Sequence, residues 1–336
     1  MKNLETLPFG KRLGCIGYLL KHTFTVVGRE RDLITPWIRT TIYGAVNSAV
    51  LVVGLGLAFQ AAAGDGDHGG LAWLLLLLAF VLYIYQHFYN NYQEVAQSWL
   101  VYQAVTGEDR TYAEARGISR DLRSTVRKLA LLDLVMTYVS SRRGGGKEGE
   151  ASSGLVSVLL AAVVEIWDLL NHYLLPATTV DRLSIRDAIG NIRHLRERVP
   201  ETLTGVFGID FIGRIVGVIV APVYLVLAVI AIGLGVAAAD WLPALHFPVS
   251  PGQLPGFLVS DGTFAITIVP LLVLFYLGKL FSVALKRGIT SIKVIYFTIF
   301  YLQITHPDWI ADDLQDELVR YLKMEEPELE TEPAGA

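Results

Sequence analysis

The residues best suited to chemistry gather in one largely apolar stretch, 155–175, near the middle of the chain. Within it, Glu165, Asp168 and His172 are spaced three and four residues apart, so a helix places them on one face. Asn171 flanks that face. Ionisable groups at membrane depth are costly and usually face a bundle interior or a water-filled cavity. This face is therefore predicted to bind a cation, relay protons or line a pore.

Other interpretations of this face stay open. Two carboxylates and an imidazole can hold a divalent metal, but three ligands on one helix do not complete a site, and no metal is predicted. If the segment lies in the cytoplasm, the same face points to water or pairs with Arg127 and Lys128. Lys279, late in an apolar span, is a further pore candidate, although a lysine there can also snorkel to the interface.

A second candidate site is a row of arginines on a short amphipathic segment. Residues 184–199 place apolar side chains at helical spacing, with basic side chains between them. The positions predicted to hold an anion or a lipid headgroup are Arg186, Arg193, Arg196 and Arg198. Each basic residue near an anionic surface contributes about 1 kcal/mol to such binding. An ordinary solvated face that obeys the positive-inside rule explains the same pattern.

Composition restricts what these residues can do. The chain has 336 residues, a mean hydropathy of +0.46 and 18% charged residues, whereas soluble domains carry about 25% charged residues. A net charge of −4 gives no support to nucleic-acid binding. The sequence lacks a Walker A motif, a G-x-S-x-G elbow and an H-E-x-x-H motif, so no cofactor is predicted and an enzyme is not favoured.

Long uncharged runs predict an all-α, polytopic bundle with four transmembrane helices. A bilayer core needs about 20 predominantly apolar residues in a helix, and each run supplies them. The predicted spans are 41–62, 71–94, 214–240 and one that starts near Thr263 and continues past Lys279. Between the third and fourth spans, residues 241–261 contain several prolines. Prolines at that density exclude a regular helix and predict an external loop or a re-entrant segment.

The distribution of lysine and arginine predicts the orientation. The loops at 63–70 and 240–263 contain neither residue, whereas the N-terminal segment and the region after Lys279 are basic. By the positive-inside rule the two loops face outward, and both termini face the cytoplasm of a cell (inner) membrane.

The middle of the chain leaves the number of spans open. Two weaker apolar stretches, 129–140 and 154–176, flank the basic linker 141–147. Because both outer flanks are also basic, the pair must cross the bilayer twice or not at all. The positive-inside rule favours a cytoplasmic or hemi-penetrating helical hairpin, and six spans remain the alternative.

The chain is accordingly expected to have three parts. Residues 1–40 form a cytoplasmic and interfacial amphipathic segment. Residues 41–305 form the transmembrane bundle, with a cytoplasmic helical insert at 106–210. Residues 306–336 form a cytoplasmic amphipathic helix, followed by an acidic tail whose composition is typical of disorder.

The order of these features resembles an uncharacterised family of prokaryotic polytopic membrane proteins. The similarity covers most of residues 10–290. It rests on the basic amphipathic entry into the first span, the motif at 104–111 after the second span, the Leu175-Pro176 helix end and the following motif at 180–184. The family implies no activity. The layout alone also resembles that of the sulfate permeases of cysteine synthesis, which form an anion path.

Three functions are compatible with these observations. Polar residues in apolar stretches and proline-broken spans favour an ion or small-solute channel or passive transporter, possibly homo-oligomeric, in the lipid bilayer. A non-transporting scaffold would instead bind a cytoplasmic protein partner through its cytoplasmic helices and acidic tail. A membrane enzyme acting on lipid through Glu165, Asp168 and His172 is less favoured.

Overall fold

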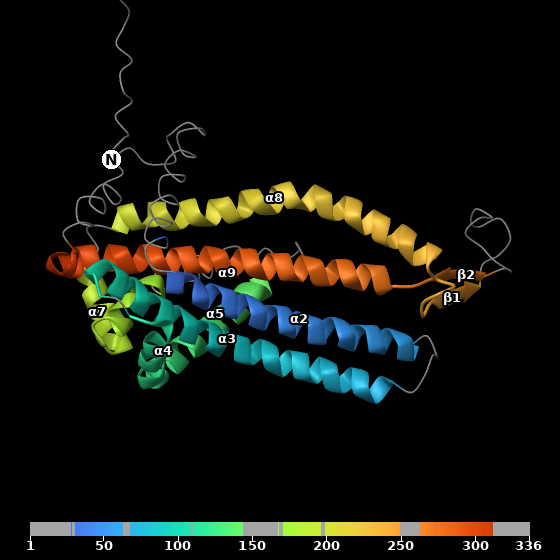
Figure 1. Ribbon diagram of the computed structural model, residues 1–336, viewed down its shortest axis with the longest axis horizontal. Helices are drawn as coiled ribbons and strands as arrows, with labels where there is room; N and C mark the ends of the chain where they lie inside the picture. The colour runs from blue at the N-terminus through green and yellow to red at the C-terminus, as the bar shows by residue number, and fades with distance from the viewer. Residues whose placement is uncertain are drawn as a thin grey trace, which may run out of the picture. The chain divides into compact units, whose positions relative to one another are not determined.

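The computed structural model describes residues 28, 31–62, 68–108, 110–143, 167, 171–195, 199–248 and 263–311. These residues are mostly helical (Figure 1). The long helices are α2 (Thr35–Ala62), α3 (Gly69–Thr106), α8 (Val199–Ala237) and α9 (Val269–Thr305). The shorter elements are η2 (Arg31–Ile34), α4 (Tyr112–Asp121), α5 (Arg123–Arg143), α7 (Ile185–Leu195), η5 (Pro307–Trp309), β1 (Leu245–Pro248) and β2 (Thr263–Ile266).

Four helical segments are long and apolar enough to cross a membrane, as the sequence predicts. They are Arg31–Ala62, Gly69–Thr106, Val216–Ala237 and Val269–Thr305. The helix ends differ from the predicted span boundaries, most clearly in the second and fourth spans. The helix of the second span continues to Thr106, well past Glu94, because its carboxamide-rich second half stays helical. The fourth helix begins at Val269, since the residues just before it form a strand.

The all-α prediction misses a small β-hairpin between α8 and α9. Strands β1 and β2 pair antiparallel, with Leu245 opposite Ile266 and Phe247 opposite Phe264. The prolines of this region do prevent a helix among the described residues, and they leave the flanking chain free to pair as strands. The Thr267 amide donates to the Gly235 carbonyl at 3.0 Å, which ties the hairpin to the end of α8.

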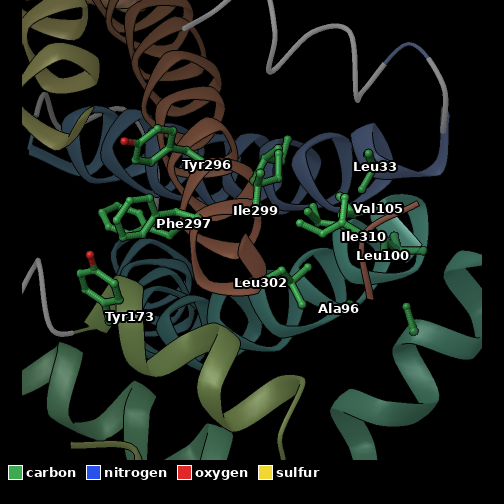
Figure 2. Packing of buried hydrophobic residues seen from close by; sticks show 14 of the residues in the cluster. Leu33, Ala96, Leu100, Val105, Tyr173, Tyr296, Phe297, Ile299, Leu302 and Ile310 are labelled. Atoms are coloured by element: carbon green, nitrogen blue, oxygen red, sulfur yellow. The ribbon is translucent and has the colours of Figure 1, made fainter. Parts of the chain in front are cut away.

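The chain divides into two compact units. The first consists of Met1–Ile38, His87–Phe211 and Gly288–Ala336, and the second of Arg39–Gln86 and Ile212–Arg287. Figure 2 shows the core of the first unit, in which Tyr296, Phe297 and Ile299 of α9 lie among side chains from the other elements. From Lys293 to Leu302 every residue of α9 is buried, so the other elements of this unit surround that part of the helix.

Aromatic rings fill this core in defined orientations. The Tyr173 ring meets the Phe297 ring edge to face, with centroids 5.3 Å apart at 68°. The rings of Tyr296 and Phe300 are nearly parallel, with centroids 6.2 Å apart. Such pairs contribute about 0.5–1.5 kcal/mol beyond the burial of their area. Tyr173 belongs to a helical segment, 171–179, that overlaps the end of the predicted pore-lining stretch 155–175.

In the second unit, α2 runs antiparallel to α3, and a glycine on α2 lets α9 approach closely. The Tyr43 hydroxyl donates to the Leu82 carbonyl at 3.3 Å. A Cβ atom on Gly44 would lie 2.5 Å from Val283 Cγ1, so α9 approaches the α2 backbone at this point. Small residues allow such approaches between membrane helices, where packing rather than the hydrophobic effect drives association.

The contact between α8 and α9 depends on another glycine. The Tyr224 hydroxyl donates to the Leu274 carbonyl at 3.0 Å. A Cβ atom built on Gly278 would lie 1.4 Å from the Tyr224 hydroxyl oxygen, so no larger residue fits there.

We predict that Gly278→Ala destabilises the protein by about 1–3 kcal/mol, because overpacking expels Tyr224 and breaks its bond to Leu274. Thermal unfolding in detergent measures the effect. Gly233→Ala is the matched control, since a Cβ on Gly233 of α8 meets nothing within 4 Å. Replacing Tyr224 by leucine in the Gly278→Ala chain should recover part of the loss. Equal unfolding temperatures for the two alanine variants would contradict this packing.

Candidate functional site

The most unusual chemistry of the first unit is a set of buried carboxamides on α3. Asn90, Gln93 and Gln97 follow one another at spacings of three and four, so they share a helical face, and Asn91 lies beside it. Each of the four is at most 5% exposed. Burying an amide without a hydrogen bond costs free energy, so each group on this face needs a partner or an explanation. We call this set the carboxamide face.

Part of the carboxamide face is paired within the protein. The Gln97 amide nitrogen donates to the Leu33 carbonyl at 3.0 Å and also contacts the Ser291 hydroxyl. The Tyr112 hydroxyl donates to Gln93 Oε1 at 2.6 Å. These bonds join α3 to η2, α9 and α4. At Ser98, the residue after Gln97, the hydroxyls of Ser98 and Thr298 lie 2.9 Å apart.

Another part of this interior is not paired. In the part of the first unit that the structure describes, five buried carboxamide oxygens accept no hydrogen bond: those of Asn90, Asn91, Gln103, Asn171 and Gln303. The Asn91 nitrogen donates to the His87 carbonyl at 3.0 Å, which leaves its oxygen directed elsewhere. The indole nitrogen of Trp167 is a buried donor that likewise makes no hydrogen bond to the described residues. Carboxamide oxygens are acceptors that suit water or a cation.

A carboxylate bridge closes one end of α9. The Tyr301 hydroxyl donates to the Asp181 carboxylate, and His306 Nε2 lies 2.8 Å from the other oxygen of that carboxylate. The His306 ring stacks on Trp309 at 3.7 Å between centroids and 7° between planes. The Asp181 and His306 side chains are 18% and 23% exposed, respectively. The bridge therefore joins segments more than 100 residues apart in a partly shielded environment, where such bonds are stronger than in water.

The backbone beside this bridge is strained. Arg182 has a φ of 53°, in the left-handed region that disfavours residues with a Cβ. The chain turns here after helix 171–179, and the Leu183 amide donates to the Ala177 carbonyl at 3.3 Å. This turn directs Asp181 toward α9. Strained residues of this kind persist only where the surrounding structure holds them.

The second unit contains a smaller polar contact and an apolar cavity. The Asn47 amide nitrogen donates to Gln86 Oε1 at 3.3 Å, and the Asn47 oxygen has no partner among the described residues. A cavity of about 180 Å³ lies between the end of α2, the start of α9 and Pro243. Gln60 is its one carboxamide among largely apolar lining residues, so the cavity offers little chemistry for an ion.

The structure describes only some of the residues that the sequence suggested as a pore. Asn171 and His172 belong to the first unit, where the His172 ring lies 5.1 Å from the Phe297 ring. Glu165 and Asp168 lie outside the described residues. Lys279 belongs to the second unit, where it is exposed and its ammonium nitrogen lies 5.9 Å from the centroid of the Phe275 ring. The grouping of these residues in one path stays a prediction.

The predicted arginine row is described only in part. The helix is present as α7, and Arg186 is exposed on its first turn. The backbone of Arg193 is helical, but its side chain lies outside the description, as do Arg196 and Arg198 entirely. Among the described residues, no group of three or more His, Cys, Asp or Glu side chains could hold a metal ion.

Comparison with models of known protein families, with curated protein sequences and with solved structures finds no match for this chain. The function of the candidate site is therefore inferred from its geometry alone. Sequence reasoning missed the carboxamide face, although its signal was present as amide side chains at helical spacing in 90–97. From the sequence, Asp181 was noted only as part of the motif at 180–184. No pattern in the sequence pointed to its partner, His306.

We predict that Asp181→Ala lowers the free energy of unfolding by about 1–3 kcal/mol, because the fully buried Tyr301 hydroxyl loses its acceptor. Chemical or thermal unfolding in detergent checks this. In a Tyr301→Phe background the same substitution should cost less, since no hydroxyl is then stranded. Additive effects of the two substitutions would mean that they do not interact.

A second prediction concerns the strained turn. Arg182→Gly should raise the free energy of unfolding by about 1 kcal/mol, because glycine adopts a φ of 53° without the Cβ penalty. Arg186→Gly is the opposite control, since glycine within α7 lowers helix stability by about 1 kcal/mol. Destabilisation by Arg182→Gly would show that the arginine side chain contributes more than the strain costs.

Proposed function

We propose that this chain is an integral membrane protein that forms a passive path for an ion or a small polar solute. The observation that carries the proposal is the group of buried carboxamide oxygens without partners in the first unit, above all those of Asn90 and Asn91 on α3. A protein interior rarely leaves such oxygens unpaired, because the cost of about 1–3 kcal/mol each is not recovered by packing. A path that brings water or ions to them supplies the missing partners.

The chemistry of these groups favours a neutral, polar lining. Oxygens of amides replace part of the hydration shell of a cation, and they also accept hydrogen bonds from water and from polar solutes. None carries a net charge, so a permeating species is not held tightly enough to prevent its release. The carboxamide face also forms part of α3, one of the four helices able to cross a membrane.

The sequence supports a passive path in a cell (inner) membrane with both termini in the cytoplasm. It has no nucleotide-binding motif that could power a pump. The loops at 63–70 and 240–263 lack lysine and arginine, which supports their outward placement. A homo-oligomer would provide further wall for the path, and we include it in the proposal. The Glu165, Asp168 and His172 face remains a candidate lining of the same path.

The proposal makes a prediction that separates permeation from stability. Asn90→Leu removes an unpaired oxygen and replaces it by an apolar group of similar size, so the folded state should be as stable as before or more stable. Flux of cations, anions or protons into liposomes should fall at least about tenfold. Gln97→Leu is the matched contrast: it strands the Leu33 carbonyl and should destabilise the fold by about 1–3 kcal/mol.

Flux and thermal unfolding are measured on the same preparations. Unchanged flux in a folded Asn90→Leu variant would remove the carboxamide face from the mechanism. An absence of flux in the unsubstituted protein, for every ion tested and in both orientations, would reject the path. The sealed aromatic packing around α9 would then favour the alternative of a scaffold that binds cytoplasmic partners.

A further inference from the structure

The exposed surfaces of α4 and α5 carry a row of side chains that follows both helices. The C-cap residue of α4 is Leu122, where φ is −83° and ψ is 11°. The Leu122 amide donates to the Ile118 carbonyl and the Val126 amide donates to the Leu122 carbonyl, both at 3.0 Å, so α5 begins directly after α4. Steps of three or four residues follow one side of each helix. This row, which we call the graded face, consists of Arg116, Arg120, Arg123, Arg127, Leu131, Val135 and Tyr138.

The chemistry of the graded face changes once along its length. Its first four residues are exposed arginines. Its last three are Leu131, Val135 and Tyr138, which are 54%, 50% and 57% exposed, and Leu132 beside them is 39% exposed. No carboxylate belongs to the row. An exposed apolar patch of this kind on a helix usually marks a surface that contacts a membrane or a binding partner.

Packing fixes the direction in which this face points. On one side of the row the neighbouring residues are buried, among them Ala115, Val126 and Ala130, each at most 1% exposed. The Ser119 hydroxyl donates to the Tyr92 carbonyl of α3 at 3.1 Å. The two helices cannot rotate about their axes without breaking these contacts, so the graded face is held outward.

The packing of α5 against α3 defines the direction in which α5 runs. Val126 lies in the same cluster as Val95 of α3, and the Asp133 carboxylate lies 3.6 Å from His87 Nδ1. The interval from Val126 to Asp133 on α5 and the interval from Val95 back to His87 on α3 each correspond to roughly 10–12 Å at 1.5 Å per residue. The two helices therefore run antiparallel. The α3 sequence before His87 is the uncharged stretch 71–86. Within the first unit, the C-terminal half of α5 therefore lies at the His87 end of α3.

From this register we propose that α5 enters one leaflet of the bilayer without crossing it, and that the graded face binds anionic lipids. The arginines lie at the level of the lipid phosphates, and Leu131, Val135 and Tyr138 contact the acyl chains of the same leaflet. Guanidinium groups pair with phosphate oxygens, and apolar side chains gain by leaving water. Anionic lipids are concentrated in the cytoplasmic leaflet, which agrees with the proposed orientation. α5 is not one of the four candidate spans.

Lipid is a better occupant of this face than a protein partner for two reasons. The bilayer is always beside a chain with four such spans, so no separate encounter is needed. The order of charge and apolarity along the row also matches the order of headgroup and hydrocarbon, whereas a protein partner requires no such gradient. This inference concerns lipid binding and stands independently of the permeation path.

Depth is tested with a nitroxide label on the full chain in phosphatidylcholine and phosphatidylglycerol vesicles. Tyr138→Cys and Arg116→Cys are each made in a Cys15→Ser background, which removes the single native thiol. We expect the label at 138 to collide more often with oxygen dissolved in the membrane, and the label at 116 with an aqueous nickel chelate. A label at 138 that prefers the nickel chelate, or that neither reagent reaches, overturns the proposal.

Lipid selectivity is tested with Arg120→Gln, Arg123→Gln and Arg127→Gln combined in one chain. Spin-labelled phosphatidylglycerol should lose its preference over spin-labelled phosphatidylcholine, by up to roughly fivefold for each arginine. Arg110→Gln is the control, because that arginine is exposed but off the row and pairs with Glu108 at 3.5 Å. An unchanged preference in the triple variant, with unchanged thermal unfolding, overturns the headgroup assignment.

Discussion

The structure of the first unit depends on the need to pair polar groups that water does not reach. The carboxamide face of α3 lies in a helix whose first half is apolar, and it meets partners from η2, α4 and α9. This requirement explains why α9 is buried on every side from Lys293 to Leu302. Aromatic rings fill the volume around that segment, and the hydroxyl and amide bonds fix its rotation. Aromatic packing and hydrogen bonding together position α3 and α9.

In the second unit, close packing at glycines accompanies a few hydrogen bonds between helices. Close approach at Gly44 and Gly278 brings side chains of one helix against the backbone of another. The Tyr224 hydroxyl uses the space above Gly278 to reach the Leu274 carbonyl. Such packing is typical of helices in lipid, where burial of apolar area gives little driving force. The two units thus rely mainly on different kinds of contact, and α3 and α9 contribute residues to both.

The sequence predicts the membrane helices well because length and absence of charge are local properties. It fails at their ends: α3 continues to Thr106 because carboxamides are compatible with a helix, but they lower its apolar signal. The strands before Val269 are short, and their prolines conceal the pairing. Of the unpaired carboxamides in the first unit, only Asn171 was among the residues singled out from the sequence. The bridge between Asp181 and His306 was not predictable, because no spacing rule relates residues 125 apart.

The buried polar groups fall into two classes, and the distinction bears on function. Gln97 and Ser98 have partners within the protein, so packing and pairing alone account for their burial. Asn90 and Asn91 keep an unpaired oxygen in the same environment, where leucine would cost nothing and fill the same volume. A chain selected only for stability would not keep two such residues on one helix. Their presence is explained by a partner that arrives from outside the chain, which is the physical basis for inferring a polar path.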